Sequence, residues 1–290
     1  MLRLAAILPI VLSFTAFILS LLCLFAGSKV GFLENADLLT LNTSMLGQNF
    51  VESKLSSSSS SSVLSSIGKD VGKDVSKVAS TVVSDIAKEI NIHDFYSVHL
   101  LDFCEGYYTP SPIINATSHP KKNVTSCSNQ TALFHFDPTT ILQKELKPGV
   151  KLSDLKWPSA VEDGIRAAEL ASKVMYVVYC IGIATTFLAF LGAVISFWTL
   201  STLSALVNLT ISMFACFCLM VASAIATGII NKVVQIVNSN GNSIGLSATK
   251  GTTFVGMTWA SDILMLLTGF VWLFHFFHSR KQAMAFIPEG

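Results

Sequence analysis

Long apolar runs alternate with one long polar stretch along this 290-residue chain. Four runs contain almost no charge, at residues 4–26, 174–198, 203–230 and 254–277. Each exceeds the roughly 20 residues that a helix needs to cross a hydrocarbon core of about 30 Å. A soluble protein rarely buries four helices of this length and composition. The pattern therefore predicts a mainly α fold, built as a four-helix transmembrane bundle.

The predicted spans divide the chain into membrane, outer and cytoplasmic segments. The spans take residues 1–27, 173–198, 203–237 (the third span with an outward extension) and 254–278. Residues 28–172 form a large extracellular loop domain, 238–253 a second outer loop and 279–290 a short cytoplasmic tail. Arg3 precedes the first span, and Arg280 and Lys281 follow the last one, which favours cytoplasmic termini because positive residues concentrate on that side. The first run has a second interpretation, a cleaved signal peptide, but it is longer than the usual apolar core of roughly 7–15 residues.

Charge is concentrated in the large outer loop. Thirteen of the 19 Lys and Arg residues and 16 of the 18 Asp and Glu residues lie between positions 28 and 172. The mean hydropathy of +0.60 agrees with a membrane protein. With a net charge of only +1 and no basic stripe, the chain gives no reason to expect a nucleic-acid partner.

Two segments of this loop have a repetitive composition. Residues 56–66 contain seven consecutive serines and two more, which predicts a flexible linker or, in the alternative, an O-glycosylated stalk. Residues 69–90 repeat Val and Ile at steps of three and four, which predicts an amphipathic helix. Its polar face mixes Lys and Asp, so packing against the outer domain is favoured over binding flat on the membrane surface.

The outer loop also carries the chemical marks of a secreted compartment. Four Asn-x-Ser/Thr triplets, at which glycans are added on the lumenal side, begin at Asn42, Asn115, Asn123 and Asn129. A fifth triplet, at Asn208, falls inside the third span and should carry no glycan. Cys104 and Cys127 are the only cysteines outside the predicted spans, and a pair in an oxidising compartment most simply forms a disulfide.

Helical spacing continues beyond two of the spans. Pro158 can start a helix that runs without interruption from about residue 159 to 198, rising above the bilayer. Apolar positions past residue 230 extend the third helix outward to a turn at residues 239–243. The two projecting helices would form a scaffold for the outer loop, to which the segment FYSVHLL, residues 95–101, is predicted to add a short strand.

The residues around the first outer cysteine resemble a known family. An aromatic pair at residues 95–96 leads into Leu101-Asp102-Phe103-Cys104-Glu105-Gly106-Tyr107, and Cys127 follows beyond a glycosylation-prone segment. Further likeness lies in residues 157–164 and 171–182. Together with four spans and a large first loop, this resembles the fungal PalI-like tetraspan family of cortical-patch, or eisosome, membrane proteins, which are themselves claudin-like, although the claudin Gly-Leu-Trp signature is absent here. The motif positions are Leu101, Cys104, Glu105, Gly106 and Tyr107.

The resemblance implies a non-enzymatic plasma-membrane protein that organises a lateral membrane domain at the cell cortex, with roles in cell-wall or membrane integrity. It also implies an alternative, a sensor component of ambient pH signalling. PalI-type sensors carry a long cytoplasmic tail, whereas only residues 279–290 follow the last predicted span, which disfavours the sensor. A transporter subunit is a third hypothesis. The expected partners are membrane lipids and either further copies of the chain or other cortical membrane proteins.

Catalytic chemistry is sparse in the sequence. There is no P-loop, no paired-carboxylate arrangement and no nucleophile elbow. The outer histidines match no standard metal-site spacing and are expected to be surface residues: His93, His99, His119 and His135. We therefore expect no enzyme activity, no metal and no cofactor.

One acidic residue, Asp262, lies inside a predicted span. At 1.5 Å per residue it is about 12 Å below the outer face, level with Tyr179 and Ser223. We expect these three to form a polar clamp between spans rather than an ion pathway, which usually needs several charges and broken helices. Close helix contact is predicted at three pairs of small residues, Ala189 and Ala193, Ala222 and Ala226, and Ala224 and Gly228.

Overall fold

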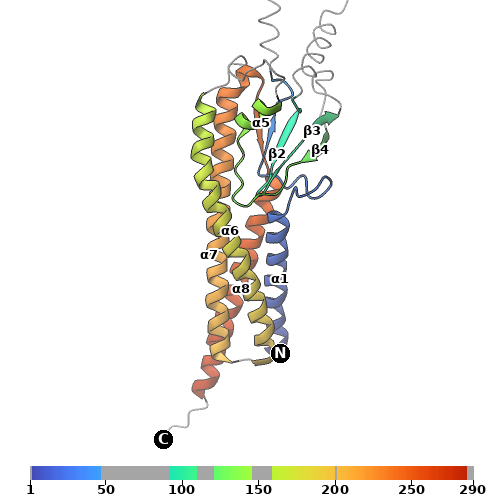
Figure 1. Ribbon diagram of the computed structural model, residues 1–290. Coiled ribbons are helices and arrows are strands. Elements are labelled where there is room, and N and C mark those ends of the chain that lie inside the picture. The colour runs from blue at the N-terminus through green and yellow to red at the C-terminus, as the bar shows by residue number, and fades with distance from the viewer. Residues whose placement is uncertain (1, 47–91, 110–120, 146–158, 200, 286–290) are drawn as a thin grey trace, which may run out of the picture.

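Four long helices form an antiparallel bundle in the computed structural model, which describes residues 2–46, 92–109, 121–145, 159–199 and 201–285 (Figure 1). The helices are α1 (Leu2–Leu24), α6 (Ser159–Thr199), α7 (Thr202–Gly241) and α8 (Thr252–Ala285). Each contains an apolar stretch long enough to cross a membrane. Around the bundle, α1 packs against α6 and α8, and α7 packs against the same two helices. The predicted four-helix transmembrane architecture is confirmed.

The second and third helices are about twice as long as a membrane is thick. At 1.5 Å per residue, the 41 residues of α6 and the 40 of α7 each span about 60 Å. Their far halves rise beside a small sheet, at the opposite end of the bundle from both chain termini (Figure 1). Both helices thus continue beyond the length of a span, as predicted, and the side of the membrane on which they project stays a prediction. The serine-rich linker 56–66, the helix predicted at 69–90 and Asn115 lie outside the described residues.

The sheet has five antiparallel strands in the order β4-β3-β2-β1-β5. They are β1 (Leu39–Asn42), β2 (Phe95–Val98), β3 (Phe103–Thr109), β4 (Lys121–Cys127) and β5 (Ser247–Lys250), with the short helix α5 (Pro138–Glu145) following β4. The sequence predicted only β2. The edge strand β4 buries the single residue Val124, so it lacks the alternation that identifies a half-buried strand. Strand β5 comes from the second of the two predicted outer loops and pairs with β1 from the first, so both loops build one sheet.

Strand β5 is tied to α7 by an amide side chain. The Nδ2 of Asn238 donates to the carbonyl of Ala248 at 3.0 Å, and the backbone N–H of Ala248 donates to Asn238 Oδ1 at 2.7 Å. Asn238 therefore completes the hydrogen bonds of β5 much as a neighbouring strand would. The helix, the turn after it and the sheet edge are held as one piece.

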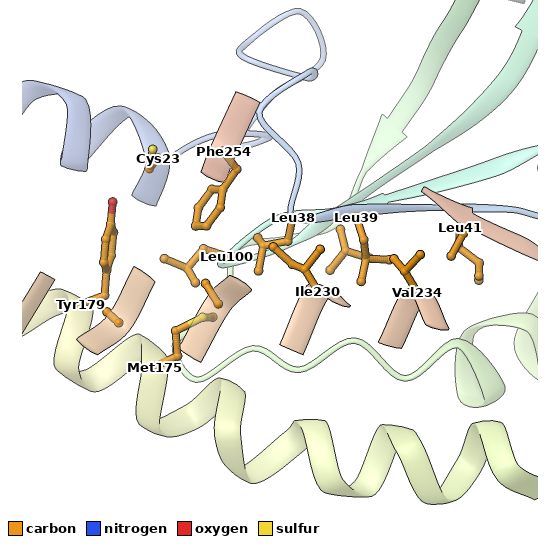
Figure 2. Close-up of a cluster of buried hydrophobic side chains, with 14 of the residues drawn as sticks. Cys23, Leu38, Leu39, Leu41, Leu100, Met175, Tyr179, Ile230, Val234 and Phe254 are labelled. Carbon is orange, nitrogen blue, oxygen red and sulfur yellow. The ribbon is translucent and has the colours of Figure 1, made fainter. Parts of the chain in front are cut away.

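One hydrophobic core runs without a break from the bundle into the sheet. Leu39 and Leu41 of β1 lie along the same row as Ile230 and Val234 of α7 (Figure 2). All four side chains are buried. Because burial of each such side chain contributes about 1.5–3 kcal/mol, this contact fixes the position of the sheet on the projecting half of α7.

Candidate functional site

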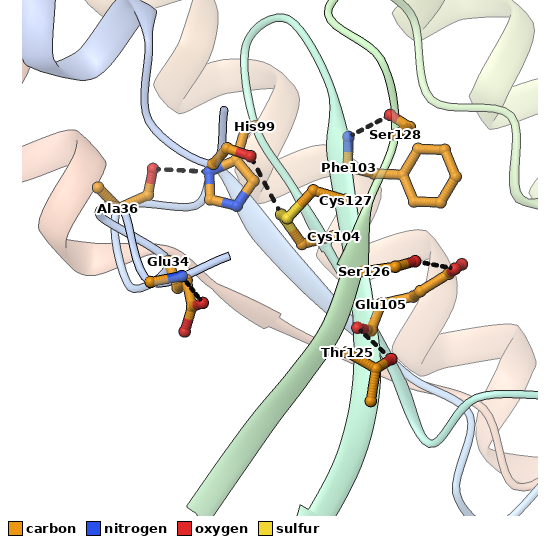
Figure 3. The surroundings of a disulfide bond; sticks show 12 residues. Glu34, Ala36, His99, Phe103, Cys104, Glu105, Thr125, Ser126, Cys127 and Ser128 are labelled. Carbon is orange, nitrogen blue, oxygen red and sulfur yellow. Dashed lines mark hydrogen bonds between the residues drawn. A yellow bond between two sulfur atoms is a disulfide. The ribbon is translucent and has the colours of Figure 1, made fainter. Parts of the chain in front are cut away.

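The outer sheet is closed by the disulfide between Cys104 of β3 and Cys127 of β4. The two residues are direct partners in the register of the two strands, with their Cα atoms 4.0 Å apart (Figure 3). The predicted pairing is confirmed. Two hydrogen bonds next to the disulfide also join these strands. Ser128 donates its N–H to the carbonyl of Phe103 at 2.8 Å, and the Ser128 hydroxyl accepts from the N–H of Phe103 at 3.1 Å. The bond therefore attaches the exposed edge strand to the buried centre of the sheet.

Gly106 of the family motif is required by a close approach of two strands. The register of β3 against β4 shifts between Glu105 and Gly106, which marks a bulge. A Cβ atom at position 106 would lie 2.1 Å from the carbonyl oxygen of Asn123 and 2.9 Å from the Phe95 ring. Only glycine fits this place without moving the backbone of β4.

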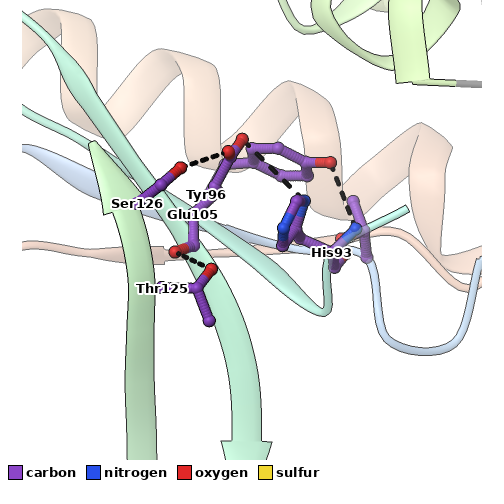
Figure 4. Close-up of polar contacts among 6 residues, drawn as sticks. His93, Tyr96, Glu105, Thr125 and Ser126 are labelled. Atoms are coloured by element: carbon purple, nitrogen blue, oxygen red, sulfur yellow. Dashed lines mark hydrogen bonds and ion pairs between the residues drawn. The ribbon is translucent and has the colours of Figure 1, made fainter. Parts of the chain in front are cut away.

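The neighbouring motif residues Glu105 and Tyr107 hold the same region from its outer face. Glu105 Oε1 accepts from the Ser126 hydroxyl at 2.5 Å, and its Oε2 lies 3.8 Å from His93 Nδ1 (Figure 4). The Tyr107 ring packs on the same His93, with ring centroids 4.9 Å apart. These contacts give the acidic and aromatic motif positions a structural role at the start of β2 and the end of β4.

The turn between β2 and β3 carries two buried leucines, one of which packs on the bundle. His99 donates its N–H to the carbonyl of Asp102 at 2.9 Å, which closes the turn and leaves Leu100 and Leu101 at its tip. Both leucines are buried. Leu100 contacts the cluster formed by Met175, Tyr179 and Phe254 at the outer end of the bundle (Figure 2). Leu100 therefore forms an apolar plug that couples the sheet to the helices, and the motif residue Leu101 is buried next to it in the same turn.

His99 is not the surface histidine that the sequence predicted. It is 1% exposed, and its ring fills the space beside Gly27, where a Cβ atom would lie 2.3 Å from the ring. Its Nδ1 is 3.3 Å from the carbonyl oxygen of Ala36, and within the described residues its Nε2 has no hydrogen-bond partner. Burial lowers the pKa of His99, and the nearby Asp37 offsets part of this effect.

Asp102 is buried at the base of the same turn. Burial raises the pKa of its carboxyl to about 6, with the Gln130 side chain acting in the opposite direction. Ligand atoms of His99, Asp102 and Cys104 all lie within 4.8 Å of one another. The sulfur of Cys104 is committed to the disulfide, however, and metals bind the thiolate, so this group is not arranged as a metal site while the bond is intact.

The described glycosylation triplets differ in exposure. Asn123 on β4 and Asn129 after it are exposed, whereas Asn42 at the end of β1 is half-buried, with its Oδ1 accepting from the N–H of Ser44 at 3.0 Å. Asn208 is buried in α7 and donates to the Ser196 hydroxyl at 2.6 Å. The two exposed positions are the most accessible acceptors, and occupancy of all four outer triplets stays a prediction.

The three residues of the predicted polar clamp are buried in the bundle, and no hydrogen bond of normal geometry joins them. The Tyr179 hydroxyl donates to the carbonyl of Ser20 on α1 at 3.2 Å. Within the described part of the chain, neither the carboxylate of Asp262 nor the hydroxyl of Ser223 has a hydrogen-bond partner at normal distance. Through its hydrogen bond to Ser20, Tyr179 joins α6 to α1. Whether Asp262 clamps the bundle stays a prediction.

Small residues mark the helix contacts, with one exception. Ala189 and Ala193 of α6 are fully buried, as are Ala222 and Ala226 of α7 to within 2%. The third pair, Ala224 and Gly228, is exposed on the outside of α7. A Cβ atom added at position 228 would meet nothing within 4 Å. Within the described residues, this pair is therefore not used for packing between helices.

These features agree with a comparison against protein families. The model of the SUR7/PalI family matches residues 5–271. The chain belongs to the SUR7/PalI family. No curated protein and no solved structure matches it. Family membership and the four apolar helices make it a multi-pass membrane protein of a family that is not known as enzymatic.

In this SUR7/PalI protein, sequence reasoning found the disulfide and missed its surroundings. The burial of His99 depends on Gly27, which is 72 positions earlier in the chain and belongs to the loop after α1. The glycine itself was the available signal, because a glycine directly after a span often marks a close approach or a positive φ. The plug at Leu100 had a signal as well, since two leucines in a tight turn are rare unless the turn is buried.

Proposed function

We propose that this SUR7/PalI protein organises a lateral membrane domain of the eisosome type at the fungal cell cortex. In this proposal it is a non-enzymatic protein of the plasma membrane. The sheet faces outward and both termini face the cytoplasm, where Arg280 and Lys281 satisfy the preference of positive residues. The resemblance of the outer motif to cortical-patch proteins supports this role.

The observation that carries the proposal is the unused pair of small residues on α7. Ala224 and Gly228 lie four positions apart on the exposed face of a membrane helix, while the two similar pairs are buried inside the bundle. Small residues at this spacing let helices approach closely, and lateral association in lipid depends on such packing. An organiser of a membrane domain needs a surface of this kind that its own fold does not occupy.

Time-lapse imaging of a tagged copy tests the role. The organiser should form stable cortical patches, and Gly228→Leu should disperse them because it blocks close helix approach. Met220→Leu, an exchange at another exposed position of α7, is the matched control and should leave the patches intact. A uniform distribution of the unaltered protein would contradict the proposal.

A second candidate is a sensor of ambient pH, which the buried turn at His99 and Asp102 favours. Asp102 titrates near the pH of mildly acidic surroundings, with a pKa of about 6, and is joined to the bundle through Leu100. The charged groups near His99 are Asp37, Glu34 and Lys122. A chain that is uniformly distributed, and whose deletion abolishes the response to alkaline medium, would favour this candidate over the organiser. Loss of that response in Asp102→Asn would assign it to the turn.

A further inference from the structure

An apolar cavity of about 70 Å³ lies between the sheet and the projecting halves of α6 and α7. Its walls are formed by Leu39 and Val98 of the sheet, Ala168 and Met175 of α6, and Val233 and Ile236 of α7. The segment after β4 covers one side through Phe134 and Phe136, whose rings pack on Phe103 with centroids 6.3 and 5.9 Å away. The cavity is therefore framed by elements that are themselves well packed.

The edge of this cavity carries charges of both signs. Glu169 and His135 belong to its lining. Glu169 Oε1 lies 2.7 Å from Lys173 Nζ, one turn further along α6, and 4.0 Å from His135 Nε2. These side chains are partly exposed, between 38 and 41%. A ligand that reaches the apolar interior past this edge thus meets an anionic and a cationic group side by side.

The membrane end of the cavity lies at the level where the predicted spans begin. Its lining includes Met175 of α6 and Ile230 of α7, and these two positions lie at the outer ends of the apolar runs 174–198 and 203–230. Runs of this length and composition lie in hydrocarbon. Lys173 directly precedes the first of them and belongs to the polar side of this boundary. Lipid of the outer leaflet is therefore the apolar material nearest to the cavity.

We propose that the cavity binds a segment of one acyl chain of a zwitterionic phospholipid from the outer leaflet. The phosphate lies against Lys173 and His135, and the ammonium group lies against Glu169. Charge complementarity selects this lipid class, because its phosphate and its ammonium group each meet an opposite charge, whereas an anionic headgroup has no cation to place against Glu169. Size selects a chain rather than a ring system, since the space is about half of the roughly 150 Å³ that admits benzene in an engineered apolar cavity. Filling it replaces missing van der Waals contacts along its walls.

Photolabelling tests this site in the full chain. The purified protein is reconstituted in phosphatidylcholine vesicles that contain a small share of phosphatidylcholine with a photoreactive group on one acyl chain. After illumination, peptide mass spectrometry should find label on the cavity-lining stretches 168–175 of α6 and 233–237 of α7. Absence of label from both stretches in the unaltered protein would overturn the proposal, whatever the variants do.

Two adjacent alanines provide a matched pair of variants. Ala168 lines the cavity, whereas Ala167 is exposed on the other side of α6. Ala168→Phe should fill the space and reduce labelling of residues 233–237 by roughly tenfold, which corresponds to about 1.4 kcal/mol. Ala167→Phe should label like the unaltered protein. Equal labelling of the two variants would contradict lipid binding in the cavity beside Ala168. An intact Cys104–Cys127 bond shows that each variant is folded. If Ala168→Phe does not fold, Ala168→Leu takes its place.

The headgroup and the alternative occupant are tested in the same vesicles. A photoreactive phosphatidylglycerol probe should label the cavity less than the phosphatidylcholine probe, and equal or stronger labelling would overturn the choice of a zwitterionic lipid. A photo-crosslinking amino acid at position 233 should capture lipid. If it instead captures residues 47–91 of the same chain, the occupant is a segment of the protein and the lipid proposal is wrong.

Discussion

The imidazole ring of His99 occupies the position that a side chain at Gly27 would need. A Cβ atom there would lie 2.3 Å from Cδ2 of the ring, and Gly27 has a φ of +78°. Through this contact the loop that leaves α1 supports the turn between β2 and β3, beside Cys104. The loop that follows the first membrane helix and the disulfide-bonded sheet are therefore packed directly on one another.

Gly27→Ala should destabilise the protein by more than its backbone conformation alone predicts. Gly31, with a φ of +86° and nothing within 4 Å of an added Cβ, is the matched control. Both variants bear the cost of a left-handed residue, roughly 1–2 kcal/mol, but only Gly27→Ala must also move His99. Thermal unfolding of the solubilised protein should give a lower Tm for Gly27→Ala than for Gly31→Ala. Equal values would contradict the packing of His99 on Gly27.

The apolar plug gives a second prediction. Leu100→Ala should lower the free energy of unfolding by about 2–5 kcal/mol, because it leaves a cavity between the turn and the outer end of the bundle. Leu170→Ala, at a side chain that is 70% exposed on α6, should change it far less. Denaturation in detergent measures both. A Leu100 variant as stable as the Leu170 variant would separate the sheet energetically from the bundle.

Stability should depend on pH through Asp102. The pKa of the Asp102 carboxyl is about 6 in the folded protein and roughly 4 in the unfolded chain. Between pH 4 and pH 6, the folded protein therefore keeps a proton on Asp102 that the unfolded chain has released. Stability from this group is therefore present below pH 4 and is lost as the pH rises to 6. As the pH rises from 4 to 6, the free energy of unfolding of Asp102→Asn should increase by up to about 3 kcal/mol relative to that of the unaltered protein.

His99 acts in the opposite direction and provides the control. Its pKa is lowered, so its contribution is present above its ordinary value near 6.5 and is lost as the pH falls below it. The stability of His99→Gln should therefore increase relative to that of the unaltered protein as the pH falls. The relative stability of Asp102→Asn should increase as the pH rises from 4 to 6. Thermal unfolding across this range measures both trends. Parallel trends in the two variants would contradict these pKa shifts.

Asp262 tests the polar interior of the bundle. If the buried carboxylate holds helices together through hydrogen bonds, Asp262→Asn should be tolerated, and Asp262→Leu should lower the stability of the solubilised protein. The loss should be modest, since interhelical hydrogen bonds in membranes average about 0.6 kcal/mol. A leucine variant as stable as the unaltered protein would remove the clamp hypothesis.

The fold was predictable where a single segment determines its own environment. A charge-free run such as residues 174–198 can only be a span, and two cysteines outside the spans can only pair with one another. Contacts between distant segments were not predictable in this way. The five-stranded order brings Leu39 beside Lys250, and the cavity brings Leu39 near Val233, although roughly 200 positions separate these pairs. His99 looked like a surface residue because its burial is decided by Gly27 and not by its own neighbours in the chain.

We expect the disulfide-closed sheet to lie outside the cell, on top of the four-helix bundle. Closing the 23-position separation between Cys104 and Cys127 should contribute roughly 3–4 kcal/mol. Cys104→Ser, Cys127→Ser and the double variant should therefore share one defect, retention in the secretory pathway, because each loses the same bond. Cys216→Ser, at a buried thiol within α7, should be milder.

Peptide mass spectrometry of the mature, surface-labelled protein without reduction tests this claim most directly. We expect a single linked species that joins the Cys104 and Cys127 peptides, with Cys216 and Cys218 recovered as free thiols. Free thiols at both outer positions in protein taken from the cell surface would contradict it.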